Sequence, residues 1–129
     1  LVKYHKIQDS LHGFYWLNRG KDYIFKTHII SNKKILNRIN KVFYIPTKAS
    51  LYRDYLNKTK IVNYESNKFE FLSEEYKKKN IETINLTIPM KDALKIYMDK
   101  NEFLFFRDDT HLNKNGAEVI AKFLIKNNY

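Results

Sequence analysis

Hydrophobic positions along the chain follow two alternating patterns. Short apolar runs, and stretches in which every second residue is apolar, are typical of buried strands, whereas apolar residues three and four positions apart are typical of amphipathic helices. The predicted strands lie at 42–45, 81–88 and 103–106, and the predicted helices begin at about 50, run over 65–79 and 90–100, and follow 115. Strands and helices that alternate at this spacing favour a parallel sheet. The pattern therefore predicts a single α/β domain over residues 1–129, with a three-layer, flavodoxin-like sandwich and a mainly parallel sheet.

Proline, asparagine and glycine mark the ends of these elements. Pro46 cannot continue a central ladder, so the first strand ends there, and Pro89 is typical of the first turn of a helix. Asn115, followed three residues later by Glu118, resembles a capping box with Asn in place of Ser or Thr. Gly116 lets the first turn pack closely. The last helix is therefore predicted to be capped by Asn115.

A short polar loop between the last predicted strand and the last helix holds two carboxylates next to a histidine. An imidazole, with an ordinary pKa of about 6.5, takes a proton from a serine hydroxyl when a carboxylate fixes its tautomer and stabilises the imidazolium. His111 is the candidate base, and Asp108 or Asp109 the candidate carboxylate. Loops at strand ends are where α/β folds place such groups. The alternative is a solvated loop whose Asp and Thr residues serve only the helix entry.

The chain is strongly basic, with 24 Lys and Arg against 14 Asp and Glu and a net charge of +10. Such a balance suits nucleic acid, an acidic polysaccharide or an anionic membrane surface. The lysine runs at 33–34 and 77–79 lie at predicted helix ends, where cations also favour the helix dipole. We interpret them mainly as solvated faces, and we expect no nucleic-acid partner.

Composition excludes several kinds of site. There is no cysteine, so a disulfide framework, a thiolate metal site and a cysteine nucleophile are excluded. The four scattered histidines form no H-x-x-x-H pair, which argues against zinc and leaves metal binding by Asp108, Asp109 and His111 as a minor alternative. Aromatic residues make up 16% of the chain, which argues against disorder.

The segment FFRDDTHLNKNGAEVIAKFLI, at 105–125, resembles the last block of the SGNH/GDSL hydrolase superfamily, D-x-x-H followed by a helix. It resembles more closely the D-T-H block of the AlgX and AlgJ polysaccharide O-acetyltransferase group. The hydrolase pattern matches Asp108 and His111, and the acetyltransferase pattern matches Asp109 and His111. We favour Asp109, because further positions fit that version. These positions are Phe106, Arg107, Thr110, Asn113, Gly116 and Ala117.

A second segment, KVFYIPTKASLYRDY at 41–55, resembles the V-P-x-K and I-Y stretch of the same group. The matching residues are Ile45, Pro46, Lys48, Leu51 and Tyr52. The resemblance implies that Lys48 or Tyr52 contacts substrate, together with Arg107. The alternative for Lys48 is a solvated lysine in a lysine-rich chain.

The nucleophile is less clearly marked. Ser10 lies in a D-S-L string that mimics a GDSL block, but polar residues interrupt the expected strand before it, and Gln8 replaces the family's glycine. There is no clear glycine or G-x-N-D block for an oxyanion hole. In the acetyltransferase group the serine block follows the D-x-H block. The resemblance therefore implies a nucleophile beyond Tyr129, in a chain that is a fragment, or a member that lost its serine, with Ser10 as the alternative.

The resemblance implies an SGNH-type carbohydrate O-acetyltransferase or acetylesterase, with a Ser-His-Asp mechanism acting on acetyl esters of a cell-surface or extracellular polysaccharide. It implies a periplasmic, cell-surface or secreted location and a membrane-associated acetylation complex as partner. We expect no cofactor and no metal. The alternative is a non-catalytic module that binds an anionic polysaccharide through Lys48, Arg107 and aromatic residues.

Overall fold

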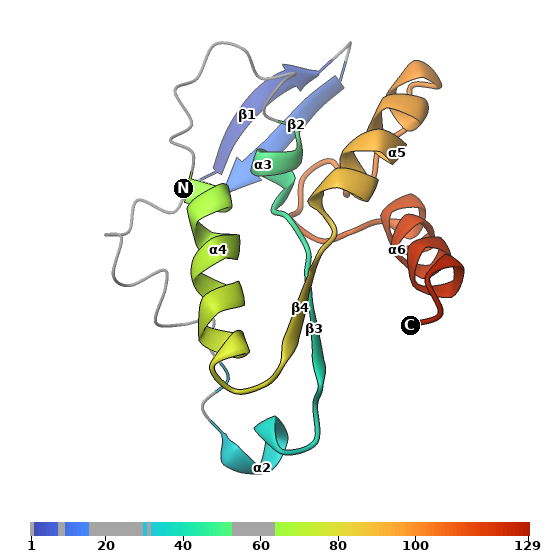
Figure 1. Cartoon of the computed structure of the whole chain (residues 1–129). Helices are drawn as coiled ribbons and strands as arrows, with labels where there is room; N and C mark the ends of the chain where they lie inside the picture. Colours follow the sequence, from blue (N-terminus) through green and yellow to red (C-terminus); the bar gives the residue numbers. More distant parts are fainter. Residues whose placement is uncertain (1, 8–9, 16–29, 31, 53–63) are drawn as a thin grey trace. The chain divides into compact units, whose positions relative to one another are not determined.

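The computed structural model describes residues 2–7, 10–15, 30, 32–52 and 64–129, with the backbone alone at 2–7, 10–15 and 64–68 (Figure 1). Its elements are β1 (Val2–Ile7), β2 (Ser10–Tyr15), α2 (Lys33–Leu36), β3 (Lys41–Tyr44), α3 (Lys48–Leu51), α4 (Tyr64–Lys77), β4 (Glu82–Asn85), α5 (Thr87–Asp99) and α6 (Lys114–Lys126). They belong to two compact units. The sheet unit holds α2, β3, α4 and β4, and the helix unit holds β1, β2, α3, α5 and α6. No helix in the described ranges is long and apolar enough to cross a membrane.

In the sheet unit, β3 pairs with β4 in parallel, from Lys41 opposite Glu82 to Tyr44 opposite Asn85. A parallel pair needs a crossover connection, and α4 lies in that connection and packs against β4. The two predicted strands and the helix predicted at 65–79 are therefore confirmed, although residues 87 and 88 open α5 instead of ending β4. The buried core of this unit is Tyr44, Leu72, Tyr76 and Ile81.

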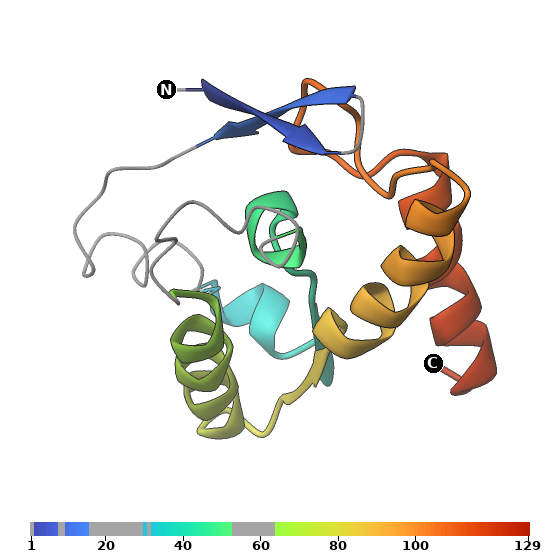
Figure 2. The same cartoon turned by 90° about the horizontal axis from the view of Figure 1, so that it is seen from above.

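In the helix unit, β1 and β2 form an antiparallel hairpin, and α5 packs against α6 and α3 (Figure 2). Met90, Leu94 and Met98 recur every fourth residue and bury one stripe of α5. Pro89 stands in the first turn, where its missing N–H is tolerated. Further fully buried residues of this unit lie in α3, before α5 and just after it: Leu51, Tyr52, Leu86 and Leu104.

The segment at 103–106 is not a strand of the parallel sheet, contrary to the prediction. Phe105 forms an isolated antiparallel bridge with Leu112, and the parallel sheet of the described residues has two strands. The reason is that nearby hydrogen-bond donors occupy the backbone carbonyls of this segment, which a strand would need for pairing in the sheet. Asn113 donates its backbone N–H to the Leu104 carbonyl, and its side-chain Nδ2 to the carbonyl of Phe103 at 2.7 Å. The chain therefore turns back on itself here instead of extending.

Helix α6 is confirmed, but its cap differs from the prediction. Asn113 is the N-cap, and its Oδ1 accepts the Gly116 N–H at 3.1 Å. Asn115 instead donates Nδ2 to the Phe103 carbonyl. Gly116 allows the close approach that was expected of it, since a Cβ there would lie 2.2 Å from the carbonyl oxygen of Leu104. The first turn of α6 is thus seated directly on the loop that precedes it.

Candidate functional site

The polar loop before α6 brings Asp109 and His111 into contact. Asp109 Oδ1 lies 2.5 Å from His111 Nδ1 and also accepts the backbone N–H of His111 at 3.1 Å. A carboxylate that accepts from the backbone two residues ahead forms a turn of its own, so the loop backbone fixes the position of this oxygen. In the tautomer that donates Nδ1–H to Asp109, the Nε2 of His111 carries the lone pair that takes a proton.

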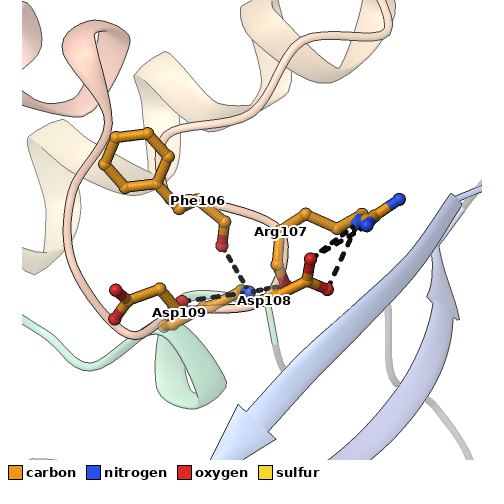
Figure 3. A network of polar contacts seen from close by, with 5 residues as sticks. Phe106, Arg107, Asp108 and Asp109 are labelled. Carbon is orange, nitrogen blue, oxygen red and sulfur yellow. Dashed lines mark hydrogen bonds and ion pairs between the residues drawn. The ribbon is translucent and has the colours of Figure 1, made fainter.

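The two neighbouring carboxylates have different partners. Arg107 donates to Asp108 through Nε, 3.2 Å from each carboxylate oxygen, and through one terminal nitrogen at 2.9 Å. Figure 3 shows the Asp108 carboxylate facing the guanidinium of Arg107, while the carboxylate of Asp109 points to the other side of the loop. The geometry therefore gives Asp109, and not Asp108, to His111.

Hydrogen bonds keep Asp109 in its ionised form. The side-chain contact with His111 is the main cause that lowers the pKa of the Asp109 carboxyl below its ordinary value, and the backbone N–H groups of His111 and Thr110 add to it. Both members of the pair are accessible, with 80% of the His111 side chain and 49% of the Asp109 side chain exposed. An ionised carboxylate beside an exposed imidazole is the arrangement that a general base needs.

Lys48 is not a solvated lysine. Only 2% of it is exposed, and its ammonium donates to three carbonyls of the loop: Phe106 at 2.7 Å, Arg107 at 2.6 Å and Asp109 at 3.3 Å (Figure 3). Burial lowers the pKa of Lys48 to about 8, while the charges of Asp108 and Asp109 act in the opposite direction. Lys48, the lysine of the V-P-x-K pattern, is thus buried against the backbone of the loop.

Tyr52 is fully buried as well, and its hydroxyl accepts the N–H of Leu104 at 3.0 Å. Its ring lies edge-on to that of Phe105, with 6.1 Å between the centroids. Tyr52 and Lys48 stand four positions apart, so α3 presents both to the same segment of chain. The two residues expected to contact substrate therefore both hold the loop from its inner side.

Ser10 lies away from a strand-to-helix turn. It is the first residue of β2 and pairs with Ile7 in the antiparallel hairpin. Its side chain lies outside the described residues. The resemblance implies a nucleophile between a strand and a helix, which is a different local setting.

No metal centre is formed by the residues that the structure describes, since no three His, Cys, Asp or Glu side chains gather at one point.

The sequence patterns missed the part that Asn113 and Asn115 play in holding the loop. A signal existed, because asparagines two residues apart at the start of a helix are strong local hydrogen-bonding groups. The buried position of Lys48 had no comparable signal.

A comparison with family models matches residues 37–127 to the SGNH hydrolase-like domain of the acetyltransferase AlgX. This range is more than half of the 129 residues and contains both segments on which the resemblance was based. The predicted relationship is therefore confirmed. No curated protein and no solved structure matches the chain.

Proposed function

Since this chain belongs to the SGNH hydrolase-like family of the acetyltransferase AlgX, we propose that it moves acetyl groups to or from a carbohydrate. In this proposal His111 is the general base and Asp109 is the carboxylate that orients it. The contact between His111 Nδ1 and Asp109 Oδ1 is the observation that carries the proposal.

The chemistry follows the serine-histidine-aspartate pattern. A serine Oγ attacks the acetyl carbonyl while His111 Nε2 removes its proton, which gives a tetrahedral oxyanion and then, as the alcohol leaves with that proton, an acetyl-serine. A sugar hydroxyl or water next attacks the acetyl carbonyl, and His111 removes the proton of that nucleophile before returning it to the serine. Ser10, or a serine beyond Tyr129 as the family resemblance implies, is the nucleophile in this scheme.

Exposed residues of the same loop are the proposed carbohydrate contacts. The Arg107 side chain is 65% exposed, and its guanidinium already holds a carboxylate, that of Asp108. A sugar carboxylate is recognised by the same geometry. Phe106 is 54% exposed, and Figure 3 shows its ring turned away from the polar contacts of the loop, so it offers an apolar face to a sugar ring. Lys48 and Tyr52 are buried and take no part in this contact.

The wider features expected of the family belong to the same proposal. They are a three-layer sandwich, a periplasmic, cell-surface or secreted location, and action on a polysaccharide within a membrane-associated acetylation complex.

The test is release of acetate from an acetylated polysaccharide by the natural protein and by its His111→Ala variant. Because the base drives both half-reactions, we expect the variant to lose turnover by roughly 10³-fold or more. Lys114→Ala, on the exposed side of the first turn of α6, is the control and should keep full turnover. Equal turnover in the His111→Ala variant overturns the proposal.

A binding assay with an acidic glycan distinguishes the alternative. Binding that His111→Ala leaves intact, in a protein that releases no acetate, identifies a non-catalytic polysaccharide-binding module and rejects the enzyme.

A further inference from the structure

The number of hydrogen-bond donors on the Lys48 ammonium equals the number of loop carbonyls that it contacts. An ammonium has three N–H donors, and Lys48 meets three carbonyl oxygens, all within residues 106–109. Taking an ammonium out of water is costly unless it is hydrogen-bonded and faces opposite charge. Here the carbonyls supply the bonds, and Asp108 and Asp109 supply the charge. The loop is therefore built around this cation.

Helix α3 aims Lys48 at the loop. The Thr47 hydroxyl accepts the Ser50 N–H at 3.2 Å and caps the helix, so Lys48 occupies its first position and Tyr52 its C-cap. Lys48 then bonds the loop at 106–109 while Tyr52 bonds Leu104 just before it. One short helix thus fixes the chain at two points ahead of His111.

The contact of Lys48 with Asp109 links the lysine to the catalytic pair of the proposal, Asp109 and His111. Lys48 bonds the backbone carbonyl of Asp109, and the carboxylate of the same residue meets His111. Phe106, whose carbonyl Lys48 also bonds, donates its N–H to the His111 carbonyl at 3.1 Å. Asp109 is therefore part of the backbone that Lys48 holds, and His111 is hydrogen-bonded to that backbone through Phe106.

We propose that Lys48 is a positioning residue whose buried ammonium sets the conformation of the loop at 106–111 and so the alignment of Asp109 with His111. The inference rests on the proposed function and deepens it. It differs from a substrate-contact role, because a buried group that touches no substrate acts mainly on the chemical step, so kcat changes more than KM.

The experiment compares Lys48→Met with Lys95→Met. Met replaces the apolar stem of lysine up to Cε and lacks the ammonium with its donors. Lys95→Met removes the same charge from an exposed position on α5, where the Lys95 ammonium lies 3.8 Å from Asp92. The first readout is steady-state acetyl transfer. A small displacement of a catalytic group costs roughly 10²-fold in rate, so we expect kcat of Lys48→Met to fall by about that factor. KM should change much less, through the shift of Phe106 and Arg107 on the same loop. Lys95→Met should match the wild type.

The second readout is the nitrogen NMR spectrum of the His111 ring, which needs no turnover. In the wild type we expect the tautomer with Nδ1–H, held by Asp109, and in Lys48→Met a mixture of the two tautomers. If Lys48→Met does not fold, Lys48→Arg replaces it. Its planar guanidinium keeps the charge but cannot reproduce the three contacts, so both readouts should move in the same direction by a smaller amount.

A higher KM with unchanged kcat, or an unchanged His111 spectrum in a folded Lys48 variant, overturns the inference. Failure of the proposed function gives a separate result, namely equal turnover in His111→Ala. The His111 spectrum of the Lys48 variants still reports on positioning in that case.

Discussion

The pair β3–β4 and the loop at 104–112 satisfy their backbone groups in different ways. The strands bond main chain to main chain in a parallel ladder, which is insensitive to the identity of the side chains. In the loop, the bonds come largely from side chains, namely those of Lys48, Tyr52 and Asn113. A ladder survives substitution at most positions, whereas the shape of this loop depends on a few individual residues.

Lys41 of β3 and Lys48, which bonds the loop, differ in burial and in their hydrogen-bond partners. Lys41 pairs with Glu82 across the strands while remaining partly exposed, and such pairs contribute little to stability because water and salt screen them. Lys48 is buried and bonded to three carbonyls. Removal of a buried partner leaves polar groups without the bonds they had in the native structure, so the second lysine has far more influence on local structure.

The largest expected effect separates the two carboxylates within the loop. Asp109→Asn should lower kcat by on the order of 10³- to 10⁴-fold, because the amide no longer holds the base in the right tautomer. Asp108→Asn is the matched control, since it changes the same group one residue away. It loosens the pair with Arg107 and removes one charge that faces Lys48, but it keeps the contact of Asp109 with His111. Steady-state acetate release measures both. A larger loss of kcat in Asp108→Asn than in Asp109→Asn would show that Asp108, and not Asp109, orients His111.

The next effect concerns the seat of α6. Alanine normally stabilises a helix relative to glycine, but at Gly116 its Cβ would lie 2.2 Å from the Leu104 carbonyl and 2.7 Å from the Leu112 side chain. We expect Gly116→Ala to lower the free energy of unfolding by about 1–3 kcal/mol. Chemical denaturation measures this, with the exposed Lys122→Ala on the same helix as control. A gain in stability for Gly116→Ala would show that α6 is not seated so closely.

The smallest effect compares one asparagine cap from the sheet unit with one from the helix unit. Asn32 caps α2 by accepting the Lys34 N–H, whereas Asn113 caps α6 and also donates to the carbonyls of Phe103 and Phe105. We expect Asn113→Ala to cost about 2 kcal/mol and Asn32→Ala less than about 1 kcal/mol, measured by denaturation of each variant. Equal losses would mean that the side chain of Asn113 acts only as a cap.

The parts of the fold that follow local rules could be predicted from the sequence. The apolar runs at 42–45 and 81–88 gave a parallel pair, because burial on a pleated surface selects that pattern. The run at 103–106 looked the same, yet it is not a sheet strand. Asn113 takes the carbonyls of Phe103 and Leu104, and Lys48, 58 positions before Phe106, takes the Phe106 carbonyl. Such a distant donor leaves no trace in local periodicity.

The sequence pointed to Asp109 and His111 of the candidate site but not to the way in which other residues hold the loop in place. The D-T-H pattern led to Asp109 and His111, and the structure brings them into contact. Lysines are seldom buried, so a lysine-rich sequence gave no reason to place Lys48 inside. Asn113 and Asn115 are the same residue type two positions apart, and only the packing of α6 decides which of them caps the helix.

The central claim is that the loop at 106–111 carries the base of a serine-dependent acetyl-transfer site. Labelling of the natural protein with a fluorophosphonate probe, followed by peptide mass spectrometry, tests it most directly, since any serine flanking residues 1–129 is then examined together with Ser10. We expect one labelled serine in the wild type and loss of that label in His111→Ala. No labelled serine, or equal labelling in the two proteins, would contradict it.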